Sequence, residues 1–339
     1  MSISIGNVSI GNRVILAPMS GVTDEAFRTV AHACGAGLVV SEMVASDALF
    51  RERRDMVRRA RGKAKLSPFV IQLAGREAHW MSEGAKIAQD LGADIIDINM
   101  GCPARQVTGG LSGSALMRDP DHALGLIEAT VSASSVPVTV KMRLGWDHGQ
   151  LNAPHIAQRA EDAGVKMITV HGRTRCQFYK GKADWQAIRA VRDAISIPLV
   201  ANGDGASAQD ARAMMQASGA DAVMFGRAAY GRPWWLGAVA HEIDQGQGKP
   251  APSLVEERDL LLWLQDETLN LYGESLGNRT FRKHLGWTVE RLLERELLSA
   301  EQVSDLRAGL LPSNDNAHVT AGIYLFFARA MDCDTRLAA

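Results

Sequence analysis

Three things are scarce in this 339-residue sequence: cysteine, long apolar runs and net charge. The four cysteines, Cys34, Cys102, Cys176 and Cys333, are scattered, with no Cys-x-x-Cys pair and no zinc-like cysteine–histidine spacing. They therefore indicate neither a disulfide scaffold nor a metal site. No apolar run approaches the roughly 18 residues that span a bilayer. The first residues do not resemble a signal sequence, so we expect a reduced, cytoplasmic protein without metal or membrane contact.

The charge balance excludes a globally basic nucleic-acid binder, because 37 Lys and Arg face 38 Asp and Glu. A local basic face remains possible within such a balance. The segment Arg51–Lys65 is one candidate, since it holds eight basic and only two acidic residues. A solvated helix is the ordinary explanation of such a run. With 46% apolar residues, the chain has enough apolar material for a large core.

Eight short apolar runs, rich in β-branched residues, recur through the first 230 residues and predict parallel strands. Their spacing is close to the length of one strand–helix–strand unit, and amphipathic stretches of helical length lie between them. We expect an α/β fold, a (β/α)8 TIM barrel, with a doubly wound open sheet as the alternative. The expected strands are Val14–Ala17, Leu38–Ser41, Phe69–Leu73, Ile95–Asn99, Val138–Met142, Ile168–His171, Leu199–Asn202 and Ala222–Phe225.

After the last expected strand the composition changes at the Gly- and Pro-rich segment Gly246–Pro252. The remainder has the pattern of helices, which we expect at Leu254–Tyr272, Arg279–Leu297, Ala300–Leu311 and Val319–Ala330. The sequence thus predicts a catalytic barrel over 1–245 and an all-helical domain over 246–339.

Polar residues cluster at the carboxyl ends of the expected strands, where barrel enzymes carry their working groups. Each one alone has a structural explanation, but so many together resemble the rim of a ligand pocket. Gly203 and Gly226 allow close approach of backbone N–H groups to an anion, and Arg227 can clamp a phosphate. Lys141 and His171 can stabilise negative charge on a heteroaromatic ring. This pattern favours FMN. The strand-end residues are Pro18, Met19, Glu42, Gln72, Asn99, Lys141, Arg143, His171, Arg173, Asn202, Gly203, Asp204, Gly226 and Arg227.

The longest loop between expected strands carries Cys102, followed by the glycine-rich stretch Gly109–Ser114. A thiol with a pKa of about 8.5 is protonated at neutral pH and can donate a proton. It can also act as a thiolate nucleophile or be an inert loop residue, and the sequence around it shows no adjacent base.

Several strings resemble the tRNA-dihydrouridine synthases, and within them the bacterial DusB branch. The similarity is dense over about residues 5–240 and looser in the tail, where Arg279–Trp287 looks like a basic helix of the family. The strings are Ala17–Asp24, Ser41–Met43, Asp97–Pro103, Val170–Arg175, Ala201–Asp204 and Met224–Ala228.

The resemblance implies an FMN-dependent enzyme that uses NADPH or NADH to saturate the C5=C6 bond of a D-loop uridine in tRNA, with uridine 17 as the position. It implies hydride transfer from FMN N5 to C6 and protonation of C5 by Cys102. Asn99, Arg143 and Arg173 are then expected at the substrate. The implied FMN contacts are Pro18, Met19, Gln72, Lys141, His171, Asn202, Gly203, Asp204, Gly226 and Arg227.

The same resemblance gives the helical tail the task of gripping tRNA. Arg282 and Lys283 lie in a small basic patch of an otherwise acidic tail, and we expect this patch and Arg51–Lys65 to contact phosphates. A monomer is the default expectation. Two alternatives remain open: another FMN barrel acting on a free small molecule, such as a dihydroorotate or dihydropyrimidine dehydrogenase-like enzyme, and a non-catalytic RNA-binding protein on a barrel scaffold.

Overall fold

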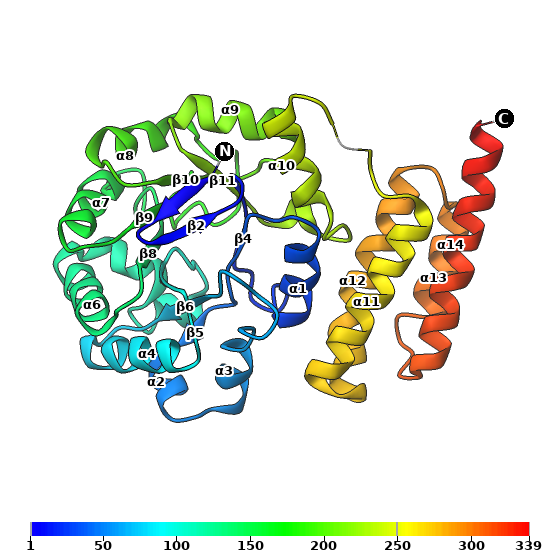
Figure 1. Cartoon of the computed structure of the whole chain (residues 1–339), viewed down its shortest axis with the longest axis horizontal. Coiled ribbons are helices and arrows are strands. Elements are labelled where there is room, and N and C mark those ends of the chain that lie inside the picture. The colour runs from blue at the N-terminus through cyan, green and yellow to red at the C-terminus, as the bar shows by residue number, and fades with distance from the viewer. Residues whose placement is uncertain (1, 249, 339) are drawn as a thin grey trace.

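The computed structural model describes residues 2–248 and 250–338, and its amino-terminal part is a closed parallel barrel (Figure 1). The first barrel strand pairs with the last, Val14 opposite Val223, which an open doubly wound sheet does not allow. The predicted TIM barrel is therefore confirmed. The strands of this sheet are β3 (Val14–Leu16), β4 (Leu38–Val39), β5 (Val44–Ala45), β6 (Val70–Ala74), β7 (Ile95–Met100), β8 (Val138–Arg143), β9 (Met167–His171), β10 (Leu199–Asn202) and β11 (Ala222–Phe225).

The second predicted strand, Leu38–Ser41, is shorter in the structure, where only β4 lies within it, and the short strand β5 follows beyond its predicted end. β4 pairs with β3, whereas β5 pairs with β6. Between them, Val40 bridges Val70 and completes the ring. The backbone leaves the ladder after Val40, and this break carries Glu42 and Met43 to the carboxyl end of the barrel.

Helices surround the sheet, and local signals that favour helix starts are satisfied in the structure. The Asp24 carboxylate accepts the Phe27 N–H at the start of α1, and Asp119 with Pro120 starts α6. The short 3₁₀ turn η2 (Gln186–Ile188) comes directly before α8. The covering helices are α1 (Glu25–Ala33), α4 (Ala78–Asp90), α6 (Pro120–Ala133), α7 (Ala153–Asp162), α8 (Arg189–Ala194), α9 (Ala208–Ser218) and α10 (Trp235–Gln245).

Short elements that the sequence pattern did not predict lie at both ends of the barrel. A hairpin of β1 (Ile3–Ile5) and β2 (Val8–Ile10) crosses the amino end (Figure 1), where Ile3, Ile5 and Ile10 pack with the apolar inner residues of the strands. The opposite end is left open. The loops there contain α2 (Ser46–Phe50), α3 (Arg54–Arg59), α5 (Arg105–Thr108), η1 (Gly113–Arg118) and η3 (Arg227–Ala229).

In the described residues after the barrel, four helices form a bundle beside it (Figure 1): α11 (Leu254–Tyr272), α12 (Glu274–Glu294), α13 (Ala300–Gly309) and α14 (Asn316–Ala338). Ser253 and Ser299 each open a helix with a reciprocal capping box. α11 packs on α1 of the barrel. One apolar core is continuous through both parts, so the bundle is fixed against the barrel rather than tethered to it.

Candidate functional site

The open, carboxyl end of the barrel holds a cavity of about 820 Å³. Every residue predicted for the cofactor lines it, and so do the predicted Cys102, Asn99, Arg143 and Arg173. The cofactor set brought together here is Pro18, Met19, Gln72, Lys141, His171, Asn202, Gly203, Asp204, Gly226 and Arg227.

Strand alternation explains why these side chains meet. Side chains two residues apart share a face of a strand, so an apolar residue deep in the barrel is followed by a polar one at the cavity. Val70 precedes Gln72 and Val200 precedes Asn202 in this way. The lower layer thus packs as an apolar core, while the upper layer forms the polar floor of the cavity.

Lys141 supplies a buried cation at this floor. Its Nζ donates to Asn202 Oδ1 at 3.1 Å. Burial, together with the Arg143 charge, lowers the pKa of Lys141 to about 8, and the Asp97 carboxylate opposes this shift. At neutral pH the site therefore holds a buried ammonium group whose hydrogen-bond partner is a neutral amide rather than a carboxylate.

His171, on the neighbouring strand, is held as a neutral imidazole. Burial lowers its pKa well below the usual value, and the charges of Lys141, Arg143, Arg173 and Arg227 act in the same direction. Arg173 Nη1 lies 3.3 Å from His171 Nε2, and because a guanidinium only donates, Nε2 is the acceptor and the neutral ring has its Nδ1–H left for a ligand.

Cys102 lies just beyond β7, and the loop that carries it is anchored to Asn99. Asn99 Oδ1 accepts the backbone N–H of Cys102 at 3.0 Å and that of Gly101 at 3.2 Å. The Cys102 carbonyl in turn accepts the Ser114 hydroxyl at 2.8 Å. The half-buried cysteine is thus held in a fixed turn on the cavity wall.

The two buried arginines predicted at the substrate, Arg143 and Arg173, use most of their N–H groups in hydrogen bonds to neighbouring loops. Arg143, only 1% exposed, donates to the carbonyls of Gly101, Thr174 and Phe178 at 2.8–2.9 Å. Arg173 forms a bidentate pair with Asp204 at 2.6 and 2.8 Å. Both line the cavity, and both also fasten its rim.

Gly203 and Gly226 form the part of the cavity suited to an anion. Gly203 has φ +132°, and a Cβ there would lie 2.6 Å from Ala183 Cβ. A Cβ on Gly226 would lie 3.2 Å from Met19 Sδ. A side chain at Gly203 therefore has no room, and one at Gly226 would require Met19 to move, so at both positions it is the glycine backbone that lines the cavity. The Arg227 side chain beside them is 60% exposed, with Asp204 at 3.7 Å as its ion-pair partner.

Sequence reasoning missed the aromatic residues of the rim. Tyr179 is 56% exposed and lies between two guanidinium groups, with Arg143 and Arg227 each 5.5 Å from its ring. Tyr230 also lines the cavity and stacks on Trp287 of α12 at 3.8 Å. Loop aromatics without a period give no signal in sequence, because only the folded loops bring them to one place.

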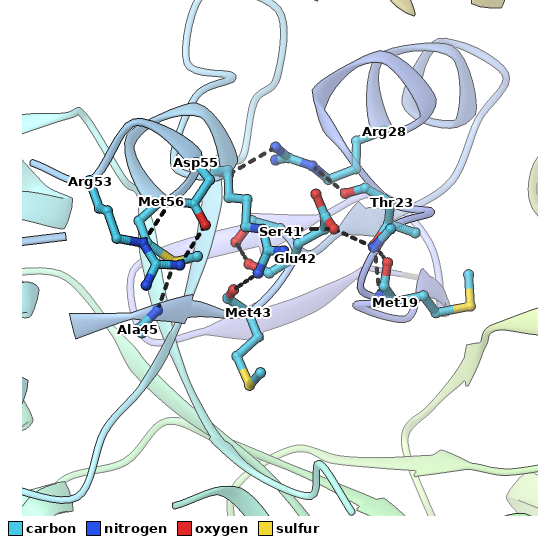
Figure 2. Close-up of polar contacts among 12 residues, drawn as sticks. Met19, Thr23, Arg28, Ser41, Glu42, Met43, Ala45, Arg53, Asp55 and Met56 are labelled. Atoms are coloured by element: carbon cyan, nitrogen blue, oxygen red, sulfur yellow. Dashed lines mark hydrogen bonds and ion pairs between the residues drawn. The ribbon is translucent and has the colours of Figure 1, made fainter. Parts of the chain in front are cut away.

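The first two loops of the rim are held by a polar cluster shown in Figure 2. The Glu42 carboxylate accepts the Gly21 N–H at 2.5 Å, and Thr23 Oγ1 accepts the Met19 N–H at 2.8 Å. The fully buried Arg28 donates to the Thr23 carbonyl. Glu42, predicted only as a polar strand-end residue, therefore positions the loop that carries Met19.

The basic segment Arg51–Lys65 is largely engaged with protein. Arg53 pairs with Asp55 and Lys63 with Asp94. Lys65 pairs with Glu267 of α11. Arg58 lies 4.6 Å from the Tyr272 ring, also on α11. The segment is in good part an attachment surface for the helical bundle.

Arg282 and Lys283 point to different surroundings although they are adjacent on α12. Arg282 donates to the Pro312 carbonyl and to Asn314 Oδ1, inside the bundle. Lys283 is half-buried, and burial lowers its pKa while the carboxylates of Asp24 and Glu42 oppose that shift. The contact of this pair with RNA stays a prediction.

Among residues 2–248 and 250–338, no group of three or more His, Cys, Asp or Glu side chains is placed to hold a metal ion. Within the same residues, no helix has both the length and the apolar character needed to cross a bilayer.

Comparisons with known proteins identify the family of this chain. The family model described as dihydrouridine synthase (Dus) matches residues 15–314. The chain is 55% identical to a probable tRNA-dihydrouridine synthase of Rhizobium leguminosarum bv. phaseoli, over 94% of this chain and 96% of that protein. It is 47% identical to tRNA-dihydrouridine synthase B of Xanthomonas axonopodis pv. citri, over 84% and 85%.

Among solved structures, morphinone reductase in complex with tetrahydroNAD is similar, with a TM-score of 0.52 and 15% identity over 76% of this chain and 93% of that one. At that identity the likeness concerns the fold alone.

Proposed function

Since the chain belongs to the dihydrouridine synthase family and is thus an enzyme of the tRNA-dihydrouridine synthase class, we propose that its barrel cavity binds FMN together with one uracil ring. The proposed substrate is a D-loop uridine of tRNA, at position 17, and the proposed reductant is NADPH. One observation carries this proposal: the ten residues expected at the cofactor, together with Asn99 and Cys102, line a single cavity.

The cavity has the size and the donor set that FMN needs. Ligand pockets typically measure about 300–1,000 Å³, so about 820 Å³ leaves room for a flavin and a pyrimidine. The glycine backbone that lines the cavity at positions 203 and 226, beside Arg227, suits the phosphate. The buried ammonium of Lys141 suits the negative charge of a reduced flavin ring.

When bound, FMN supplies the electron pair that saturates the uracil C5=C6 bond and regains it from NADPH. Lys141 and the neutral His171 hold the ring system through a cation and an N–H donor. Gln72 and Asn99 reach the cavity as amides and orient the edges of both rings. The loops fastened by Arg143 and Arg173 limit access of water to the reacting atoms.

Cys102 is the proposed proton donor. Its Sγ gives a proton to C5 of the uracil as negative charge develops there. A positioned acid of this kind contributes typically about 10²–10⁴ in rate. Asn99 and Ser114 hold the backbone on both sides of the sulfur-bearing residue, which keeps the donor in place.

Residues 246–339 are the proposed tRNA-binding domain, with the protein acting as a monomer. The target uridine leaves its stack to enter the cavity, as for other enzymes that act on bases. Arg282, Lys283 and the basic residues of Arg51–Lys65 are the proposed phosphate contacts.

Position-resolved mapping of dihydrouridine in tRNA tests this proposal. We compare cells with the gene, cells without it, and cells carrying Cys102→Ala. Dihydrouridine at position 17 is expected only in the first. Loss at another D-loop position corrects the position alone, whereas an unchanged dihydrouridine pattern without the gene contradicts the proposed function.

A further inference from the structure

Beneath the cavity floor lies a buried carboxylate that the proposed chemistry does not use. Asp97 on β7 is 4% exposed. Its Oδ1 accepts the Thr139 hydroxyl at 2.6 Å, and its Oδ2 accepts Gln72 Nε2 at 2.6 Å. A buried carboxylate is costly unless hydrogen bonds and a nearby opposite charge compensate it, and the Lys141 ammonium provides that charge.

The contact with Gln72 is the first link of a chain that ends at Cys102. Gln72 Oε1 accepts Asn99 Nδ2 at 2.7 Å. Asn99 Oδ1 then accepts the backbone N–H groups of Cys102 and Gly101. Two side chains, Gln72 and Asn99, thus connect the buried carboxylate with the backbone of the proposed proton donor.

The groups at the two ends of this series of hydrogen bonds determine which atom of each amide donates and which accepts. Backbone N–H groups only donate, so the oxygen of Asn99 must face them and its nitrogen must face Gln72. Gln72 must then turn its oxygen to Asn99 and its nitrogen to Asp97. The Gln72 N–H thus needs an acceptor, and the Asp97 carboxylate, which only accepts hydrogen bonds, supplies it.

The polarity of the chain decides what the cavity offers. Asn99 Oδ1 already accepts two hydrogen bonds, which occupies both of its lone pairs. The amide of Asn99 therefore has only an N–H left for a ligand, whereas Gln72 has a second N–H on Nε2 and one lone pair on Oε1. A uracil presents a carbonyl acceptor at C4, where a cytosine presents an amino donor.

We propose that Asp97 is a positioning residue that fixes the amide orientations of Gln72 and Asn99, so that the site accepts a ring edge with a carbonyl and rejects one with an amino group. This rests on the proposed function for the identity of the pyrimidine. Asp97 touches neither ligand and acts through the two amides.

Two substitutions at the same position separate polarity from charge. In Asp97→Asn, the new oxygen can accept from Gln72 Nε2 while the new amide nitrogen donates to Thr139 Oγ1, so the polarity of the chain survives. In Asp97→Ala the anchor is lost and the Gln72 amide is free to turn over. Thr139→Val is the matched control, because it removes the other hydrogen bond of the same carboxylate and leaves the chain intact.

The experiment measures FMN affinity of flavin-stripped protein by fluorescence titration, and kcat and KM on tRNA transcripts with U or C at the target. For Asp97→Ala we expect FMN affinity and kcat to fall about tenfold or more, with KM for tRNA unchanged and the preference for U over C reduced. Asp97→Asn is expected to restore FMN affinity and the preference to within about threefold of the wild type, as in Thr139→Val.

An Asp97→Asn protein as impaired as Asp97→Ala overturns the proposal, because charge rather than polarity is then responsible. Equal behaviour of Asp97→Ala and Thr139→Val overturns it as well. Should Asp97→Ala fail to fold, Asn99→Asp tests the proposal instead. This variant keeps an oxygen that accepts the backbone N–H groups of the loop but lacks the side-chain N–H. An unchanged preference for U in Asn99→Asp contradicts the proposal. If the wild type makes no dihydrouridine, the proposed function fails, while the FMN titrations still test the chain of amides.

Discussion

Basic residues have different partners in two regions of this protein, the cavity and the surface segment Arg51–Lys65. On the surface, Lys63, Lys65 and Arg53 each form an ion pair with a nearby carboxylate. In the cavity, Lys141 has an amide oxygen as its hydrogen-bond partner, and its pKa falls to about 8. A charge that remains buried without a paired carboxylate costs folding energy, so its position identifies a ligand site better than a cluster of surface charges does.

The two regions meet at the helical bundle. Tyr230 of the cavity wall stacks on Trp287 of α12, and a Cβ on Gly231 would lie 2.7 Å from the Trp287 carbonyl carbon. Lys283, one turn earlier on α12, is near Asp24 and Glu42, which belong to the first two rim loops. The bundle thus supports the wall of the cavity as well as extending the surface beside it.

The largest effect is expected at Cys102. Cys102→Ala should lower dihydrouridine formation by about 10²–10⁴, because the proton donor is lost. FMN content and NADPH oxidation should remain, and both are measured on the same preparation. Cys176→Ala, an exposed cysteine in the loop after β9, is the control. Unchanged product formation in Cys102→Ala removes that residue from its proposed role.

The pH dependence of FMN binding tests the buried cation. Lys141 loses its proton as pH rises through about 8, so FMN affinity should fall above that pH by at most tenfold per unit. Lys141→Arg should abolish this decline, since a guanidinium stays charged. Binding of FMN by the stripped protein at pH 6–10 measures it, and a flat wild-type profile contradicts the assignment.

Stability has a related pH dependence with the opposite sign. Between about 8 and 10.5 the unfolded chain keeps the Lys141 proton that the folded protein has released. Since the unfolded state then binds more protons, the contribution of Lys141 to the free energy of unfolding rises with pH over this window. Denaturant unfolding of wild type and Lys141→Met separates this contribution.

The contact between bundle and cavity wall is broken by Trp287→Ala. We expect the free energy of unfolding to fall by about 1–3 kcal/mol and FMN affinity to fall several-fold, because Tyr230 loses its support. Trp287→Phe, which keeps a stacking ring, should recover most of both. Equal FMN affinity in the alanine variant and the wild type shows that the bundle does not shape the cavity.

Arg282→Ala and Lys283→Ala test the basic patch of α12. For each variant separately, the affinity for tRNA is measured at several salt concentrations. A residue that contacts a phosphate should reduce the slope of log affinity with log salt by about 0.7–0.9. Flavin content should not change. A lower stability with an unchanged salt slope assigns the residue to the bundle or to the Asp24–Glu42 contact instead.

The smallest effect is expected at the surface ion pair of Lys65 with Glu267. Lys65→Ala should change the free energy of unfolding by less than about 1 kcal/mol, because exposed pairs contribute little. Salt titration of the stability of Lys65→Ala and Glu267→Ala measures it. A large loss in both would make this pair a principal attachment of the bundle.

The sequence by itself determined the barrel and the composition of its cavity. Apolar runs at near-regular spacing predict parallel strands, and alternation along each strand places Gln72, Asn99, Lys141, His171 and Asn202 at one end of the same cylinder. Once the strands form, the alternation of side chains along the backbone determines which residues face the inside of the barrel.

Only the tertiary structure decided which groups face one another across loops and between the two parts of the chain. The chain from Asp97 through Gln72 to Asn99, the ring of Tyr179 between two arginines, and the stack of Tyr230 on Trp287 join residues that no local period relates. The separation of β4 from β5 and the ion pairs of Arg51–Lys65 are likewise determined only by the tertiary structure. Long side chains and loops choose partners by proximity in the folded protein, and that proximity is set by packing rather than by sequence distance.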